Sequence, residues 1–288
     1  HLHGGGPVSD DFDPEHQPPP GLWMLLTAAS TTEAAYAWRE QVSVVGAGWA
    51  GLSAAVSLAD RGTPVTVFEA SRSLGGRARR VSIDGADLDN GQHILIGAYR
   101  ETLALMRKVG ADPETLLMRL PLELRFANGF HLRAPRLPYP LNLLAGLLGA
   151  RGLSLAQGLA AIRFMARMQQ GAFRVQPDCS VAVLLETNGQ LGALRRYLWE
   201  PLCISALNTP PTDASAQVFA NVLRDGLTGA RENSDLLLPC TDLGRLFPEP
   251  AAAFITARGG SIELGVAVRR VTRDETAFRL DDRPQRFS

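Results

Sequence analysis

The sequence predicts an α/β fold, and the order of patterns between residues 42 and 69 carries this prediction. A short β-branched run, Val42–Val45, is followed by glycines spaced G-x-G-x-x-G. An alanine-rich amphipathic stretch covers residues 52–59, and a second apolar run, 65–68, ends at Glu69. Strand, turn, helix, strand and acid in this order form a βαβ unit with the fingerprint of a dinucleotide-binding domain.

Each residue type in the fingerprint has a physical reason. Gly46 permits a tight turn, Gly48 lets a pyrophosphate approach the backbone, and Gly51 lets the helix pack closely on the sheet. The helix start offers free N–H groups and a partial positive charge to phosphate. Glu69 can accept hydrogen bonds from ribose hydroxyls, and its charge disfavours the 2′-phosphate of NADP. The predicted cofactor-binding residues of this unit are Gly46, Ala47, Gly48, Ala50, Gly51, Glu69 and Ala70.

The strand before the glycines, the helix after them and the terminal acid favour a cofactor loop over the alternative, an ordinary glycine turn in an α/β domain. The fingerprint alone does not separate NAD from FAD, but the next stretch does. GAGWAGLSAA and then FEASRSLGGRARR together resemble the FAD-binding amine oxidase and phytoene desaturase superfamily. The resemblance implies FAD as the cofactor. It places the doublet Gly75 and Gly76 along the flavin cofactor, with Arg77 supplying charge-assisted hydrogen bonds to the diphosphate. The alternative is a flexible loop with surface arginines.

A second part of the resemblance lies in residues 88–93, LDNGQH, which follow a hairpin signal around Asp84-Gly85. In the superfamily this segment brings backbone against the flavin ring, so the resemblance implies cofactor contacts at Gly91 and Gln92. The D-N-G-Q-H motif at residues 89–93 resembles most the squalene-associated FAD enzymes of hopanoid biosynthesis, which form one branch of the superfamily. His93 is the candidate catalytic residue, although a lone histidine more often has a structural role.

The middle of the chain indicates apolar helices. Residues 141–148 are very apolar, and Ser154 with Gln157 fits a capping box that starts a second helix. Arg151 and its neighbouring glycines exclude one continuous membrane span. Two interpretations remain open: core helices of a cap domain, or an apolar face that rests on a bilayer or lines a lipid tunnel. The resemblance favours the second, because the branch handles long isoprenoid chains.

The remaining elements are predicted from helical spacing and turn residues. Helices are expected over 178–185, 191–198, 213–227 and 251–258, and strands over 261–264, 267–271 and 277–280. WEPLCISALN resembles a stretch of desaturase-like enzymes, in which Trp199 packs either against substrate or in the core. ARGGSIELGVAVRRV resembles the element that touches adenine, which implies a backbone contact at Val268.

The resemblance covers 42 to about 271 but only the front part of a typical family member, so we expect a C-terminally truncated chain. The expected domains are a disordered tail or non-native extension (1–41), the first part of a Rossmann-type FAD-binding domain (42–98), a mixed helical and antiparallel substrate domain (99–240), and an incomplete return to the FAD-binding domain (241–288). The fold is therefore α/β, with the FAD-binding domain split around the substrate domain.

Composition indicates which partners and which cellular compartment to expect. The 288 residues carry no net charge, which gives no indication of a nucleic-acid partner. Three cysteines without paired spacing predict a reducing compartment and neither disulfide nor metal site. The apolar run 22–29 is too short to span a membrane. We expect a cytoplasmic protein, with peripheral contact to the inner face of the membrane as an option.

The resemblance implies an FAD-dependent oxidoreductase acting on a long isoprenoid, with reductive dehydroxylation of hydroxysqualene to squalene as the first expectation. The alternatives on the same scaffold are a carotenoid desaturase of the phytoene type and an amine oxidase. An alternative of another class is a non-catalytic prenyl-binding protein. The sequence leaves the electron donor and the oligomeric state open.

Overall fold

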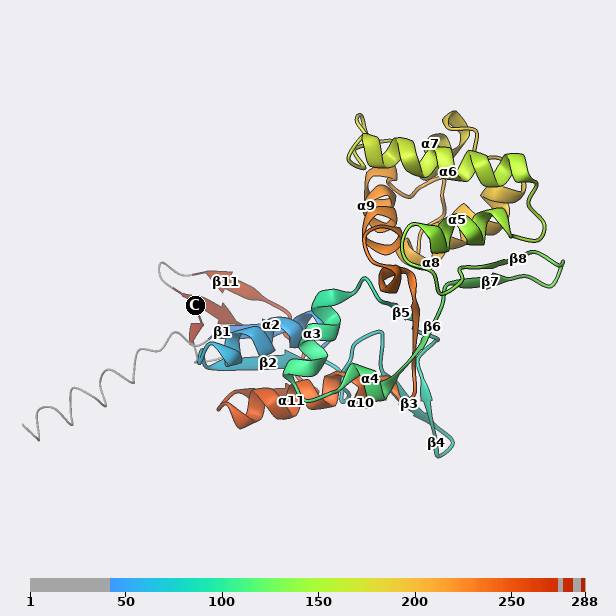
Figure 1. Ribbon diagram of the computed structural model, residues 1–288. Helices are drawn as coiled ribbons and strands as arrows, with labels where there is room; N and C mark the ends of the chain where they lie inside the picture. Colours follow the sequence, from blue (N-terminus) through green and yellow to red (C-terminus); the bar gives the residue numbers. More distant parts are fainter. Residues whose placement is uncertain (1–41, 274–276, 282–285, 288) are drawn as a thin grey trace, which may run out of the picture.

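The computed structural model of the protein describes residues 42–273, 277–281 and 286–287. Figure 1 shows strands and short helices around a parallel sheet at one end of the molecule and a group of helices at the other. The predicted tail, residues 1–41, lies outside the described residues, and so does the apolar run 22–29. The α/β class predicted from the sequence is confirmed.

A three-stranded parallel sheet forms the base of the first body (Figure 1). Strand β2 (Val65–Glu69) lies between β1 (Val42–Val45) and β10 (Ser261–Leu264). Every residue of β2 but the last is buried, as expected for the central strand of a parallel sheet. Helix α2 (Trp49–Asp60) connects β1 to β2, and α11 (Pro248–Ala257) leads into β10; both helices pack on one core.

Further helices of the first body include α3 (Arg100–Lys108), α4 (Pro113–Leu116) and α10 (Leu243–Leu246). Helix α3 buries Leu103 and Met106 in the same core as α2 and α11. This stretch belongs by packing to the cofactor side of the molecule, although the sequence-based division ends the first cofactor segment at residue 98. That division stays a prediction, and the packing supports a boundary nearer residue 120.

Two small antiparallel units adjoin the first body. The hairpin predicted around Asp84-Gly85 forms from β3 (Arg80–Ile83) and β4 (Ala86–Asp89). A second sheet has the order β5-β9-β6, from β5 (Leu95–Ile96), β9 (Leu236–Pro239) and β6 (Leu117–Leu120). Strand β6 carries the chain toward the second body and β9 brings it back, so this sheet holds the two crossing segments together.

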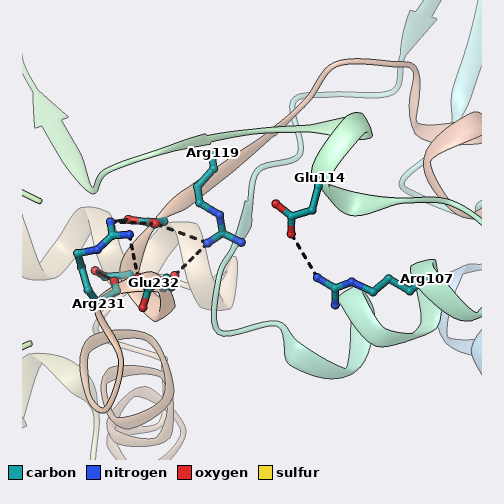
Figure 2. A network of polar contacts seen from close by, with 7 residues as sticks. Arg107, Glu114, Arg119, Arg231 and Glu232 are labelled. Atoms are coloured by element: carbon teal, nitrogen blue, oxygen red, sulfur yellow. Dashed lines mark hydrogen bonds and ion pairs between the residues drawn. The ribbon is translucent and has the colours of Figure 1, made fainter. Parts of the chain in front are cut away.

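An ion-pair network ties the crossing segments beside that sheet (Figure 2). The side chain of Asp235, only 3% exposed, lies 3.5 Å from Nη1 of Arg119 and 3.3 Å from Nη1 of Arg231. Arg119 also donates to the main-chain oxygen of Glu232 over 3.4 Å. Because the carboxylate is buried and both partners are arginines, the network fixes how the two segments pass each other.

The second body combines the β7–β8 hairpin with helices around its own core (Figure 1). The hairpin turns at Asn128-Gly129, as predicted. The core of the second body contains Phe164, Trp199 and Phe219, each almost fully buried. The elements are β7 (Glu123–Arg125), β8 (His131–Arg133), α5 (Leu141–Leu148), α6 (Leu155–Gln170), α7 (Val181–Thr187), the π-helix η1 (Arg195–Trp199), α8 (Glu200–Leu207), α9 (Ala216–Leu227) and the 3-10 helix η2 (Arg231–Ser234).

Helices α7 and α9 start three residues later than predicted, and α11 starts three residues earlier, at Pro248 and not at residue 251. Helices α7 and α9 begin after the N-caps Ser180 and Ser215, not at residues 178 and 213. Asp178 does not cap α7; its carboxylate accepts hydrogen bonds from the hydroxyl of Ser215, the N-cap of α9, and from the Gln217 amide in the first turn of α9. The predicted helix 191–198 is also wrong in extent, because the π-helix runs directly into α8, whose first turn accommodates Pro201.

The predicted strand 267–271 is also wrong, because residues 266–270 are irregular. The amides of Arg269 and Arg270 donate to the Asp281 carboxylate and not to a neighbouring strand. A separate antiparallel sheet follows, with the order β11-β12-β13, from β11 (Val271–Arg273), β12 (Phe278–Leu280) and β13 (Arg286–Phe287).

Candidate functional site

The glycine loop after β1 leads directly into helix α2. Gly46 has a φ of +101°, a conformation that glycine adopts without strain, and its amide donates to the Phe68 oxygen over 2.7 Å. Gly51 lies on the first turn of α2, where an added Cβ would stand 1.9 Å from the main-chain oxygen of Gly46. Only glycine at 51 allows this close packing, which brings the helix against the main chain of the loop, whereas the sequence predicted close packing against the sheet.

The glycine doublet lies against the same loop. Gly75 bridges to Gly48, and its amide donates to the Ala47 oxygen over 2.9 Å. Gly76 has a φ of +63°, and a Cβ there would stand 3.1 Å from the Cα of Gly48. Bare backbone therefore meets bare backbone at this point. Gly48 is also the N-cap of α2 and offers no side-chain hydrogen bond, so the helix start is left to a ligand such as a diphosphate.

The carboxylate of Glu69 is fixed beside this loop. Its Oε2 accepts a hydrogen bond from the Ala47 amide over 2.7 Å, and its Oε1 accepts from the Ser71 amide over 2.8 Å. Each carboxylate oxygen has a second lone pair, so the group can still accept hydrogen bonds from ribose hydroxyls. Ala70, the next predicted contact, is exposed at the same edge.

The chain leaving β10 passes over the end of β2. The Val266 amide donates to the main-chain oxygen of Glu69 over 2.8 Å, and the Gly265 amide donates to that of Ser71 over 2.9 Å. Val268 follows in the irregular segment and packs, partly buried, against Phe68. The predicted adenine contact therefore lies close to the predicted ribose acceptor, although not in the predicted strand.

The segment around His93 folds next to the residues that follow the doublet. The Asn90 side chain donates to the Arg77 oxygen over 3.1 Å, and the Asn90 amide donates to the Arg79 oxygen over 2.8 Å. His93 is half-buried, with Nδ1 3.2 Å from the Gly91 oxygen. The structure thus brings 90–93 together with the doublet loop. The predicted contacts Ala50, Arg77, Gly91 and Gln92 all have exposed side chains or backbone.

Sequence reasoning missed three residues here. The Trp49 indole donates to the Ala78 oxygen over 3.1 Å, which fastens the doublet loop to the start of α2. Asn90 joins the two loops as described above. The Nε of Arg79 is buried and has no hydrogen-bond partner among the described residues, so an acceptor is missing beside the doublet. The D-N-G and G-G-R-x-R spacings were the available signals for Asn90 and Arg79.

These features meet the requirements for an adenine dinucleotide. The backbones of Gly48 and Gly76 form a cradle that a Cβ at Gly76 would fill. No side chain caps the start of α2. The buried Nε of Arg79 has no hydrogen-bond acceptor among the described residues. An anionic diphosphate would accept hydrogen bonds from the free amides at the start of α2 and from the arginine. The residues present therefore fit FAD at this loop.

An apolar cavity of about 180 Å³ lies in the second body, between helices α5, α6 and α8. Trp199 forms part of its wall while being only 1% exposed, so the core and substrate interpretations of this residue are compatible. Its indole donates to Oε1 of Gln190 over 2.9 Å and packs edge-on against Phe164. Most of the lining is apolar and comes from Leu143, Leu144, Leu147, Ile162, Met165 and Leu202.

Titration and metal binding add little to the candidate site. Burial, with a smaller contribution from the Glu200 carboxylate, raises the pKa of the Cys203 thiol and so disfavours the reactive thiolate. Across the described ranges, no cluster of His, Cys, Asp and Glu side chains is suited to a metal ion. No helix in the same ranges has the length and apolarity needed to cross a bilayer.

The fold and the loop together define a Rossmann-type nucleotide-binding domain joined to a helical body with an apolar cavity. A family match then specifies the group: residues 49–286 match the flavin containing amine oxidoreductases, and the chain belongs to this family. This confirms the resemblance seen in the sequence and supports FAD as the cofactor.

Individual relatives agree with the family. The chain is 26% identical over 237 residues to hydroxysqualene dehydroxylase of Zymomonas mobilis, covering 79% of this chain and 54% of that protein. It is 27% identical over 254 residues to a probable zeta-carotene desaturase of Synechococcus elongatus, covering 82% and 52%. The crystal structure of an oxidoreductase from Methanosarcina mazei matches with a TM-score of 0.61 at 17% identity, covering 84% of this chain and 56% of that one. The chain thus spans about half the length of the curated relatives it matches.

Proposed function

We propose that the protein is an FAD-dependent oxidoreductase that converts hydroxysqualene reductively to squalene. The bare-backbone cradle of Gly48 and Gly76 at the start of α2, beside the fixed Glu69 carboxylate, carries the cofactor part of the proposal. The substrate part rests on the similarity to hydroxysqualene dehydroxylases. The apolar cavity supports an isoprenoid substrate, because its wall offers almost no polar partner.

The cofactor would be held by groups that the chain already presents. The start of α2 and Arg77 receive the diphosphate, Glu69 accepts from the ribose, and the backbone near Val268 lies at the adenine end. The segment 90–93 lies at the flavin end. Bound FAD would supply hydride transfer. We also propose that the molecule divides into a cofactor body and a substrate body, as the two separate cores support.

The reaction replaces a C–O bond with a C–H bond. The hydroxyl would leave as water after gaining a proton, and the carbon would receive a hydride whose two electrons come from an external reductant. The chain's own task is to hold the isoprenoid and exclude water. His93 is the candidate proton donor: with Nδ1 bonded to the Gly91 oxygen, Nε2 is the ring atom available to carry the second proton.

The test is anaerobic incubation of the protein, with FAD chemically reduced beforehand, with hydroxysqualene. Squalene detected by mass spectrometry is the expected result, and His93→Gln should lower its rate while leaving the flavin spectrum unchanged. Bound flavin without squalene would overturn the substrate assignment.

A second candidate is carotenoid desaturation, which the similarity to zeta-carotene desaturases favours. Here the isoprenoid is oxidised and not reduced. Aerobic incubation with zeta-carotene and analysis for a more conjugated product separates the two reactions. We further propose that the isoprenoid is supplied from a membrane surface, for which the next observations identify a face.

A further inference from the structure

Helices α5 and α6 expose large apolar side chains to solvent. On α5, Leu141 and Leu148 are 54% and 46% exposed; on α6, Leu155 and Leu159 are 66% and 41% exposed. We call these four leucines the leucine face. Long apolar side chains at this level of exposure, gathered on two neighbouring helices, indicate a surface that is covered in use.

Helical spacing and one interhelix contact place these leucines together. Leu141 and Leu148 are seven residues apart and Leu155 and Leu159 four apart, so each pair lies on one side of its helix. An added Cβ at Gly158 would meet the Leu147 oxygen and the Leu148 side chain, at 3.1 and 3.5 Å, so α5 and α6 touch next to the leucine face. Figure 1 shows the two helices running side by side.

The leucine face lies next to the apolar cavity. Leu144 and Leu147 of α5 line the cavity, and they neighbour Leu148 along that helix. Ile162, one turn beyond Leu159, lines it from α6. The exposed leucines therefore lie on the same two helices that line the apolar cavity.

Charge around this surface is strongly one-sided. Residues 124–177 contain seven arginines and no aspartate or glutamate, while the rest of the chain holds 22 basic and 29 acidic residues. All seven arginines are exposed. Among the described residues, two of these arginines form ion pairs, Arg125 and Arg133, both with Glu123, which also lies 2.8 Å from Nε2 of His131. The remaining five arginines of the segment are Arg136, Arg151, Arg163, Arg167 and Arg174.

An apolar strip edged by arginines matches the surface of an anionic bilayer. Leucines enter the boundary between headgroups and acyl chains, and guanidinium groups attract anionic headgroups. We propose that the leucine face and its arginines dock the protein on an anionic lipid bilayer, with the cavity of the second body turned toward the acyl chains. Docking itself rests on the exposed residues; its purpose, delivery of an isoprenoid, rests on the proposed function.

Flotation of the purified protein with lipid vesicles tests the docking. The protein should float with vesicles containing phosphatidylglycerol, bind vesicles of phosphatidylcholine alone at least tenfold more weakly, and lose binding in high salt. Arg163→Glu with Arg167→Glu should weaken binding about 25-fold or more, because each surface arginine contributes about fivefold. Leu155→Asn with Leu159→Asn should weaken it about tenfold.

Matched controls are available on the same molecule. Leu191, 51% exposed in the second body, and Arg61, exposed on the first body, lie outside the leucine face and its acid-free segment. Leu191→Asn and Arg61→Glu should leave vesicle binding unchanged. Equal binding to neutral and anionic vesicles, or equal losses in the control variants, would overturn the proposal. Concentration-dependent dimers in light scattering, abolished by the leucine variants and without vesicle binding, would identify a second copy of the chain as the occupant and overturn it too.

Turnover of detergent-dispersed hydroxysqualene distinguishes this proposal from the proposed function. Absence of vesicle binding with intact turnover overturns docking alone. Vesicle binding with bound flavin and no squalene supports docking and overturns the reaction. Variants that lose vesicle binding yet keep turnover in detergent support both.

Discussion

The amide of Ala47 donates a hydrogen bond to Oε2 of Glu69 over 2.7 Å, and this contact joins the two ends of the predicted fingerprint. The residues are separated by 22 positions in the chain. Their contact holds the carboxylate at the glycine loop before any ligand arrives. An acid fixed in this way needs little reorganisation to receive a ribose, which reduces the entropic cost of binding.

Glu69→Gln should weaken flavin binding. The amide keeps the size of the side chain but loses the negative charge and one acceptor, and a hydrogen bond to a charged group contributes about 1.5–3 kcal/mol. We expect a loss of affinity of about 10- to 100-fold, measured by quenching of flavin fluorescence. Glu186→Gln, an exposed change on α7 of the other body, is the control and should bind flavin normally.

Gly51→Ala should destabilise the protein although it lies in a helix. Alanine is ordinarily about 1 kcal/mol better than glycine there. Here its Cβ would stand 1.9 Å from the Gly46 oxygen, so loop and helix must separate. We expect the free energy of unfolding to fall by about 3 kcal/mol in urea denaturation.

The control for Gly51 is Gly226→Ala in helix α9. There the nearest atom to an added Cβ is the flexible end of Ile96 at 3.4 Å. This variant should be neutral or slightly stabilising. Equal effects at the two glycines would contradict the steric explanation.

Trp199→Phe should destabilise the second body by about 2–4 kcal/mol. The change removes buried volume and leaves Oε1 of the buried Gln190 without its donor. Chemical denaturation monitored by circular dichroism measures the loss. In a double-mutant cycle, Gln190→Met combined with Trp199→Phe should cost less than the sum of the single changes, whereas additive costs would show that the hydrogen bond contributes nothing.

Asp178 should make stability depend on pH. Its carboxylate accepts hydrogen bonds from the Ser215 hydroxyl over 2.6 Å and from the Gln217 amide over 2.9 Å, and these bonds, the Ser215 bond first, hold its pKa below the ordinary value. A lowered folded-state pKa stabilises the protein above the unfolded value of about 3.9, and the contribution disappears as the pH falls through the folded value.

Asp178→Asn removes this titration. The variant should be less stable than the parent at pH 7, and the difference in urea midpoint should shrink steadily below about pH 4. Midpoints at neutral and acidic pH provide the measurement. A difference that stays constant across the range would mean that the lost stability comes from geometry and not from charge.

Local patterns were the ones that sequence reasoning predicted well. The capping box of Ser154 and Gln157 forms with both of its hydrogen bonds, and Asp112 caps α4 ahead of Pro113. These signals act over three or four residues, so the chain carries them wherever it folds. The helix starts at Ser180 and Ser215 were missed, because Asp178 has its partners 37 and 39 residues away.

The sequence by itself determined the βαβ unit, its glycine turn and the acid at its end, because strand, turn and helix signals are local. Only the tertiary structure decided that Gly76 meets Gly48, that β10 becomes the third parallel strand, and that α3 packs with the cofactor body. Only it decided, too, that the leucines of α5 and α6 face solvent and not a core. Apolar periodicity predicts that a helix has an apolar side. What that side contacts depends on long-range packing, which no local pattern encodes.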